Sequence, residues 1–406
     1  MKKPFLFCAS AVFLFALISC GPGSGSKDRL TVTMSLGESE WQVMRSKVFP
    51  LFESRYGVKV EGIQIESGSL ATKLDALQKA GKAEIDVVAQ DNMNLAVLVN
   101  KGLVEDLSQY EDEIPANTIP SLVQSLKFDG RLLFMPFRPN VQIVYYHKEK
   151  FDEYGLEVPR TWEQLRETAK MLKEKEERGR ILLKGFGGNP TATQVYEFIL
   201  QAGGEPYAFD DEGCIRAFAF LQKLWPYAAQ GSQRAKWDTT NRMIANQQVY
   251  LAQNWPFGVT ILVKEYGLDF IGTYSGWKGP HGERHVIGGD VLGIPSISAR
   301  KELARKFIWF LQSKEVQELL VGELGWPSMR TDAYGQVEEW QKQYYASVQK
   351  AMKHGEFREN VTWWPAYVKY VTEAFREIVI EQAPVEETLK KYKKKLEGAK
   401  ELYRER

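Results

Sequence analysis

Leu30-Thr31-Val32-Thr33-Met34 alternates apolar and polar side chains, which is the pattern of a half-buried strand. The next segment, 41–57, carries apolar residues at helical spacing up to a closing glycine, and Val58-Lys59-Val60 resumes the alternation. A second helix is expected over 69–80, followed by the buried strand Ile85-Asp86-Val87-Val88-Ala89. Strands and helices that alternate at this spacing form a parallel sheet with right-handed crossovers. The stretch therefore predicts an α/β fold.

Polar residues follow two of these strands. Residues 35–41, which include Glu38, Glu40 and Trp41, come after the first strand, and Gln90-Asp91-Asn92 comes after the third. Ligands of parallel sheets bind beyond the carboxyl ends of the strands. We therefore expect a binding edge here.

The rest of the chain also contains segments with strand and helix patterns. Pro136 and Pro139 bracket Arg138 ahead of a strand over 141–146, which indicates a crossing between two lobes. Another strand is expected over 287–294, and a C-terminal apolar stripe from Val385 to Tyr403 predicts an amphipathic helix that packs on its own domain.

The first twenty residues resemble an export signal. Lys2 and Lys3 precede an apolar run over 5–18, too short for a permanent membrane helix, and small Ser19 meets Cys20. Leu17-Ile18-Ser19-Cys20 resembles the lipobox of bacterial lipoproteins, whose cysteine is acylated. We expect a signal peptide at 1–19 and a lipid-anchored flexible tether at 20–27; the alternative is an ordinary signal peptide with an incidental Cys20.

Composition excludes several classes of function. A net charge of +1 argues against nucleic-acid binding, and the lysine runs at 173–178 and 390–395 fit solvated helix faces. Cys214 is alone beyond the leader, so no disulfide framework is possible. His281 and His285 stand among glycines and a proline, which excludes a helical metal pair, and we expect no metal and no cofactor. The sequence contains no G-x-S-x-G elbow and no H-E-x-x-H motif.

Several short sequence segments, in a fixed order, resemble those of a known family. They are Phe52-Glu53-Ser54-Arg55-Tyr56-Gly57-Val58-Lys59-Val60, the 85–88 strand leading to Asp91, Lys101-Gly102-Leu103-Val104-Glu105-Asp106-Leu107, Asp129-Gly130-Arg131, Val144-Tyr145-Tyr146-His147-Lys148, Pro159-Arg160-Thr161-Trp162, Asn254-Trp255-Pro256, Gly288-Gly289 and Pro327 to Arg330. Over nearly the whole mature chain this order resembles the bacterial extracellular solute-binding proteins that include the maltose- and trehalose/maltose-binding proteins of sugar ABC transporters.

The resemblance implies a two-lobed periplasmic-binding-protein fold of type II. Each lobe would be a mixed, largely parallel sheet flanked by helices, with a sugar held in the cleft between them. Lobe one would comprise 28–137 and 288–335, and lobe two would comprise 138–287 and 336–406.

The resemblance also implies a set of substrate-binding residues and no catalytic ones. By position they are Glu38, Glu40, Trp41, Asp91, Arg138, Asn140, Trp255, Gly289, Asp290, Arg330 and Trp364. Carboxylates, amides and guanidinium groups suit sugar hydroxyls, and an indole suits the apolar face of a pyranose. Relatives that bind trehalose or maltose tend to have an acidic residue where Asn140 stands and a tryptophan where Asp290 stands, so the identity of the sugar does not carry over.

Four of these residues have structural alternatives. Trp255 could wedge the hinge, Arg330 could cap a helix or pair with a core carboxylate, and Asp91 could be a helix N-cap. Trp363 and Trp364 are adjacent, so at most one is expected to face the cleft.

The sequence favours an exported, lipid-anchored, monomeric receptor that captures a carbohydrate by hinge closure and delivers it to an ABC permease. The alternatives are a secreted glycoside hydrolase, which needs two carboxylates about 5 to 10 Å apart, and a structural or adhesive lipoprotein.

Overall fold

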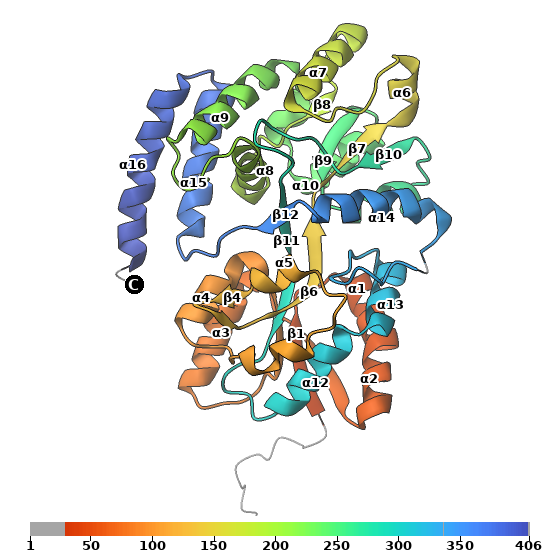
Figure 1. Ribbon diagram of the computed structural model, residues 1–406, viewed down its shortest axis with the longest axis vertical. Helices are drawn as coiled ribbons and strands as arrows, with labels where there is room; N and C mark the ends of the chain where they lie inside the picture. The colour runs from red at the N-terminus through yellow and green to blue at the C-terminus, as the bar shows by residue number, and fades with distance from the viewer. Residues whose placement is uncertain (1–28, 336, 405–406) are drawn as a thin grey trace, which may run out of the picture.

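The protein, described by a computed structural model over residues 29–335 and 337–404, is built from two bodies joined by long strands (Figure 1). The predicted signal peptide, Cys20 and tether lie outside the described residues. The strands of the first body, with those that join it to the second, are β1 (Arg29–Met34), β2 (Lys59–Gln64), β3 (Val87–Asp91), β4 (Lys127–Phe128), β5 (Arg131–Leu132), β6 (Met135–Val141), β11 (His285–Gly293) and β12 (Gly355–Phe357). The strands of the second body are β7 (Ile143–His147), β8 (Ile181–Leu182), β9 (Leu251–Asn254) and β10 (Ile271–Tyr274).

Helices cover both sheets. The first body carries α1 (Glu38–Val43), α2 (Phe49–Tyr56), α3 (Ser67–Lys79), α4 (Leu95–Asn100), α5 (Pro120–Gln124), α12 (Lys301–Leu311) and α13 (Lys314–Leu324). The second carries α6 (Lys148–Glu153), α7 (Trp162–Glu176), α8 (Gly188–Gln201), α9 (Glu212–Leu224), α10 (Trp237–Ala245), α11 (Phe257–Val259), α14 (Glu339–Met352), α15 (Trp364–Phe375) and α16 (Val385–Arg404). Short π and 3-10 turns adjoin them: η1 (Met44–Val48), η2 (Asn92–Asn94), η3 (Ser108–Glu113), η4 (Trp225–Tyr227), η5 (Gln230–Arg234), η6 (Thr260–Glu265) and η7 (Arg376–Ile380).

The first sheet confirms the pattern expected for the N-terminal stretch. β1 lies between β2 and β3 and runs parallel to both. The helix that precedes β2 ends at Gly57, whose φ of 66° is a left-handed conformation that glycine adopts without steric cost. The carboxyl ends of β1 and β3 therefore meet at one edge, as predicted.

The second sheet differs from the expected, largely parallel arrangement. β7 pairs antiparallel with β9 and with β10, and only the β8–β9 pairing is parallel among these four strands. The chain itself explains this: β7 follows directly from β6 and runs away from the first body, while β9 and β10 run back toward it. The fold remains a mixed α/β architecture, in which β2, β1 and β3 form a run of three parallel strands and β8–β9 and β11–β12 are single parallel pairs.

Two strands carry the connection between the bodies (Figure 1). β6 and β11 pair antiparallel from Val141↔Ile287 to Met135↔Leu292, with an irregularity between Asp290 and Val291. β11 also pairs with β3 over 290–293, at its first-body end, and with β12 over 285–287, at its second-body end. The expected crossing at 136–140 and the expected return strand are therefore adjacent.

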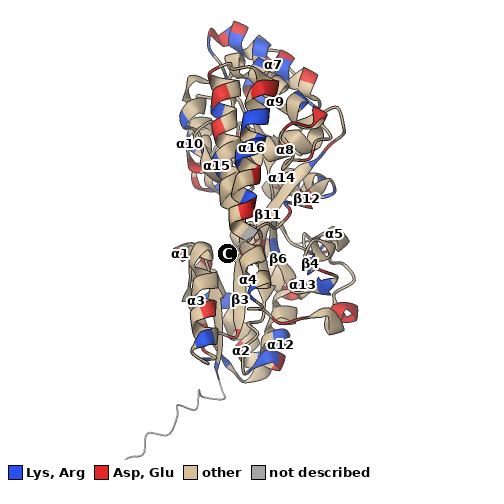
Figure 2. Ribbon diagram, turned by 90° about the vertical axis from the view of Figure 1, so that its left-hand side faces the viewer, with Lys and Arg blue, Asp and Glu red and all other residues tan. Residues whose placement is uncertain are grey.

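The C-terminal helix packs on its own body, as expected. Leu389, Tyr392 and Leu396 of α16 are buried against α15 and α9. Lys391 and Lys393, on either side of the buried Tyr392, pair with Glu377 and Asp210. Lys and Arg alternate with Asp and Glu along the helices on this side (Figure 2).

Candidate binding cavity

A cavity of about 500 Å³ lies between the two bodies. Ser67, Asp91, Met93 and Asn94 line it from the first body, and Gly188, Asn189, Trp237, Trp364, Pro365 and Val368 line it from the second. Of the predicted binding residues, Asp91 and Trp364 are the two in its lining. The cavity size is typical of small-molecule sites.

Strand geometry explains why Asp91 is there. β3 ends at Asp91 opposite Asp290 of β11, while β12 runs parallel to β11 and ends opposite Ile287. The carboxyl ends of β3 and β12 therefore approach each other along β11, one from each body. This convergence places the residues that follow each strand beside the cavity.

Asp91 serves two purposes at this point. Its Oδ1 accepts a hydrogen bond from the backbone N–H of Met93 at 2.8 Å, which is the N-cap role foreseen as the alternative. It also lines the cavity. Burial and the nearby carboxylate of Asp290 raise the pKa of Asp91. A ligand hydroxyl or other donor at the cavity would stabilise the charged carboxylate.

Arg358 faces this carboxylate from the end of β12, and the sequence prediction missed it. Its side chain is 4% exposed, and its Nη1 donates to Thr193 Oγ1 at 2.8 Å, while its Nε is buried without a hydrogen-bond partner among the described residues. Burial lowers the pKa of Arg358, and the charge of Asp91 opposes this effect. Its guanidinium lies 5.3 Å from the centre of the Trp364 ring. A strand of only three residues ahead of it gave no usable signal in the sequence.

Trp364 presents an indole to the cavity, and its neighbour does not. Trp364 Nε1 donates to Asn189 Oδ1 at 3.2 Å, which joins α15 to the start of α8. Trp363 instead packs on Tyr207, with Lys400 Nζ 4.3 Å from its ring centre. Of the two adjacent tryptophans, Trp364 is therefore the one that lines the cavity.

Three predicted site residues, Glu40, Arg138 and Asp290, form hydrogen bonds with one another and do not line the cavity. Arg138 donates to Asp290 Oδ2 at 2.6 Å and to Glu40 Oε1 at 2.9 Å. Its guanidinium also stacks 4.5 Å from the ring centre of Trp326, whose Nε1 donates to Glu40 as well. Although burial disfavours its charge, the two carboxylates raise the pKa of Arg138. This cluster ties α1 and the α13 end to both crossing strands.

Trp41 does not fit a stacking role. It is 3% exposed and packs edge-on against Phe49, while its Nε1 donates to Gln64 Oε1 at 2.6 Å. A Cβ on Gly62 would lie 2.4 Å from its ring, so the indole fills the space that this glycine leaves. Arg45 covers the ring at 4.7 Å. Trp41 is therefore a core residue, and exposed Glu38 on the same helix does not line the cavity.

Asn140 and Gly289 belong to the junction of β6 and β11. Asn140 pairs with Gly288, and its Oδ1 is buried without a hydrogen-bond partner among the described residues. Gly289 has a φ of 107°, and a Cβ there would lie 2.1 Å from the carbonyl oxygen of Arg138. Glycine is thus required at 289 by the close approach of β6.

Trp255 occupies the position that the wedge alternative predicts. Its ring packs on the backbone at Gly288, where a Cβ would lie 3.0 Å from Cη2, and meets Trp237 edge-on at 6.0 Å. Tyr145 donates to its carbonyl oxygen at 2.7 Å. Trp237, not Trp255, lines the cavity.

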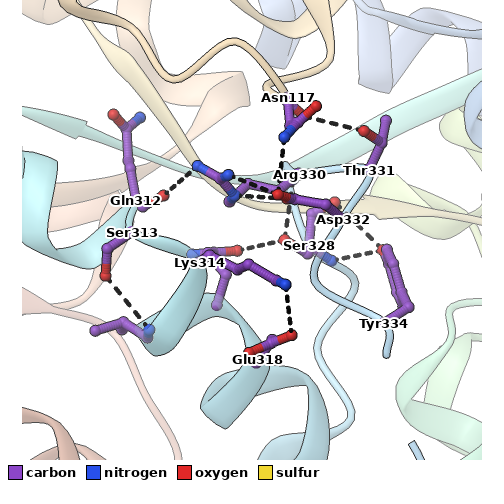
Figure 3. Close-up of polar contacts among 12 residues, drawn as sticks. Asn117, Gln312, Ser313, Lys314, Glu318, Ser328, Arg330, Thr331, Asp332 and Tyr334 are labelled. Carbon is purple, nitrogen blue, oxygen red and sulfur yellow. Dashed lines mark hydrogen bonds and ion pairs between the residues drawn. The ribbon is translucent and has the colours of Figure 1, made fainter. Parts of the chain in front are cut away.

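Arg330 also follows its structural alternative (Figure 3). Its Nε and Nη2 donate to the carboxylate of Asp332 at 2.8 and 2.9 Å, and its Nη1 donates to the carbonyl of Gln312. Asn117 Nδ2 also donates to Asp332 Oδ2, at 2.8 Å. The arginine therefore fastens the turn after α13 rather than lining the cavity.

The described residues hold no group of three or more His, Cys, Asp or Glu side chains that could bind a metal ion. His285 is fully buried between Glu197 and Glu283, and His281 packs over Gly203. Within the described part of the chain, none of the helices combines the length and the apolar character needed to span a membrane.

Comparison with known proteins identifies the family. Residues 48–346 match the family model of bacterial extracellular solute-binding proteins, and this chain belongs to that family. Its members are binding proteins found outside the cytoplasm. The resemblance inferred from the sequence is thus confirmed.

Two relatives share part of the sequence. The mannitol-binding protein of Pseudomonas aeruginosa is 29% identical over 148 residues, which is 35% of this chain and 33% of that protein. The multiple sugar-binding protein of Streptococcus mutans is 22% identical over 209 residues, which is 47% of this chain and 50% of that protein. The chain therefore spans no more than half the length of either relative.

The fold is matched over nearly its full length. The sugar-binding protein MalE from the phytopathogen Xanthomonas citri superimposes with a TM-score of 0.83 at 18% identity, covering 93% of this chain and 98% of that one. The type II two-lobed fold expected from the resemblance is therefore confirmed.

Proposed function

We propose that this protein is the carbohydrate receptor of an ABC transporter. The observation that carries the proposal is the interbody cavity, where the Trp364 indole adjoins Asn189 and where Asp91 and Arg358 approach from opposite bodies. An indole suits the apolar face of a sugar ring, and carboxylate, amide and guanidinium groups suit its hydroxyls. The sugar and polyol ligands named for two relatives agree with this chemistry.

The mechanism is closure about the crossing strands. The proposed lobes are 28–137 with 288–335 and 138–287 with 336–406, and they meet the ligand from opposite sides. A ligand that contacts both lobes binds the closed form more tightly and shifts the equilibrium toward it. The closed complex then docks on the permease as a monomer.

A thermal-shift and calorimetric screen of monosaccharides, oligosaccharides and polyols tests the receptor role. A ligand at 100 times its Kd adds about 2.7 kcal/mol to the free energy of unfolding, which is a readily measured shift. The expected result is a saturable shift with one sugar class. No shift with any sugar or polyol would contradict the proposal.

A glycoside hydrolase needs a pair of carboxyl groups, one of them with a raised pKa. Asp91 has a raised pKa and lies opposite Asp290 in the β3–β11 pairing, so the hydrolase alternative can be tested. Asp290, however, is held by Arg138, and the family consists of binding proteins. We propose that the chain has no catalytic role. Incubation with any glycan that binds, followed by product analysis, should return the glycan intact; cleavage would favour the hydrolase.

We also propose that Cys20 is acylated and anchors the protein to the outer face of a membrane. The basis is the Leu17-Ile18-Ser19-Cys20 phrase at the end of the leader. Replacing Cys20 with Ala should move the protein from the membrane fraction to the soluble fraction. Unchanged fractionation would contradict the anchor.

A further inference from the structure

Phe186 is an exposed aromatic residue beside the cavity. Its side chain is 58% exposed, and it stands in the loop that leads from β8 to α8, between Gly185 and Gly187. Gly188 and Asn189, the first two residues of α8, line the cavity. A chain of three residues spans at most about 11 Å between Cα atoms. The backbone of Phe186 therefore lies close to the residues that line the cavity.

The loop that carries this ring is firmly held. The N–H groups of Gly185, Phe186 and Gly187 donate to Ser232 O at 2.9 Å, to Ala235 O at 3.3 Å and to Thr191 Oγ1 at 2.9 Å. Gly187 and Gly188 have φ of 97° and 62°, which other residues rarely adopt. Because the backbone that carries the ring is held, a ligand that packs on the ring has only its side-chain torsions to order.

A neighbouring chain segment also lies close to the cavity. Lys236 Nζ lies 4.6 Å from the centre of the Phe186 ring, and the next residue, Trp237, lines the cavity. The lysine covers part of the ring and brings three hydrogen-bond donors beside it. An apolar ring and an ammonium group thus stand together, each close in the chain to a residue that lines the cavity.

We propose that Phe186 and Lys236 form an outer subsite for a sugar ring that extends beyond the cavity. The ring of Phe186 would pack on the apolar face of that sugar, and Lys236 would donate to its hydroxyls. The ligand is accordingly an oligosaccharide rather than a free monosaccharide or a short polyol. This inference rests on the proposed carbohydrate receptor function and specifies its substrate class.

Calorimetric titration with two length series tests the subsite. The probes are maltose, maltotriose and maltotetraose, and cellobiose, cellotriose and cellotetraose, with mannitol as the short polyol. In the series that binds, the tetrasaccharide should bind about tenfold more tightly than the disaccharide, as expected for one added stacking contact. Phe186→Ala should remove this gain and leave disaccharide affinity within about twofold.

Tyr266→Ala is the matched control, because Tyr266 is 55% exposed and does not line the cavity. It should retain the length dependence. Equal affinity for short and long members, or an equal loss for both in Phe186→Ala, would overturn the outer subsite while leaving the receptor role intact. Absence of binding by every probe would overturn the oligosaccharide class, and failure of the broader sugar and polyol screen as well would overturn the receptor role itself.

Discussion

Trp364 and Trp363 differ in what covers their rings. Trp363 meets Tyr207 edge-on, has Lys400 over its ring and does not line the cavity. Trp364 lines the cavity, although it is 7% exposed and the Arg358 guanidinium lies 5.3 Å from its ring centre. A pyranose can stack only on a ring that borders the space it occupies. We therefore expect Trp364 to be the main stacking residue of the cavity.

Trp364→Ala should weaken sugar binding roughly tenfold to a hundredfold, because a stacked ring contributes about 1 to 3 kcal/mol by analogy with aromatic stacking on bases. Isothermal titration with a confirmed ligand measures the loss. Trp363→Ala is the adjacent control and should keep its affinity. Equal losses in both variants would show that the effect comes from a disturbed α15 rather than from stacking.

Trp255 should affect stability instead of affinity. Its ring fills the space over Gly288 at the junction of the bodies, so Trp255→Ala leaves a void that is expected to cost about 3 to 5 kcal/mol of unfolding free energy. Denaturant unfolding measures that loss, and titration of the folded protein should give near-normal affinity. A large loss of affinity without destabilisation would restore the stacking role first considered for this residue.

Residue types and the family resemblance predicted more binding residues than line the cavity. Asp91 ends a strand that the sequence located, whereas Trp364 was predicted only from the family resemblance; both line the cavity. Trp41 and Arg330 are also residue types that suit a sugar. In the structure, however, the Trp41 ring packs against Gly62 and the Arg330 guanidinium donates to Asp332, so neither lines the cavity. Their partners are distant in sequence or lie across a turn, so residue type alone could not separate ligand contacts from packing.

At the scale of elements, β11 links the cavity to the connection between the bodies. It pairs with β3, β6 and β12, and its irregularity falls beside Gly289 and Asp290. The periodicity of the sequence located this strand and the N-terminal sheet. The periodicity could not predict β12, because that strand has only three residues. It also could not predict the direction of β7, because that direction depends on where β6 ends in the fold.

Gly289→Ala should destabilise the junction. The added Cβ would meet the Arg138 carbonyl at 2.1 Å, and the residue would hold a φ of 107°, so a cost of about 1 to 3 kcal/mol or more is expected. Gly398→Ala is the control, because Gly398 is exposed in α16 with open space around it and should gain roughly 0.5 to 1 kcal/mol. Chemical unfolding of both variants checks the contrast; an unchanged midpoint for Gly289→Ala would contradict the close approach.

α8 connects the cavity to β11 through buried charge. The helix begins at the cavity with Gly188 and Asn189, and its Glu197 accepts from Val286 N at 2.9 Å. His285 lies 3.5 Å from Glu197 and 3.2 Å from Glu283. Although burial opposes its charge, these two carboxylates raise the pKa of His285 to about 9.

His285→Gln should therefore destabilise the protein in a pH-dependent way. A histidine whose folded pKa exceeds its unfolded value stabilises fully below about pH 6.5, and that contribution is lost as pH rises through about 9. The stability difference between wild type and variant should shrink by about 3 kcal/mol across this window. Urea unfolding at pH 6 and pH 9.5 measures it; a constant difference would show that folding does not raise the pKa of His285.

At the scale of the whole molecule, the two bodies contact each other beside the cavity through few direct bonds. The backbone N–H of Leu95, at the start of α4, donates to Asn360 Oδ1 at 3.3 Å across the interface. Asp91 and Arg358 lie nearby but make no ion pair within 4 Å among the described residues. A ligand that bonds to both groups would add contacts that hold the bodies together.

Small-angle scattering should then show a smaller radius of gyration when a confirmed sugar saturates the protein. The reason is that the extra contacts exist only in the closed form, so binding shifts the population toward it. Trp364→Ala, measured at a sugar concentration that saturates wild type but not the variant, should scatter like the ligand-free protein. The comparison separates closure from any general effect of the added sugar on the solvent. Identical curves for wild type with and without saturating ligand would show a preformed site, and would contradict a hinge at β6 and β11.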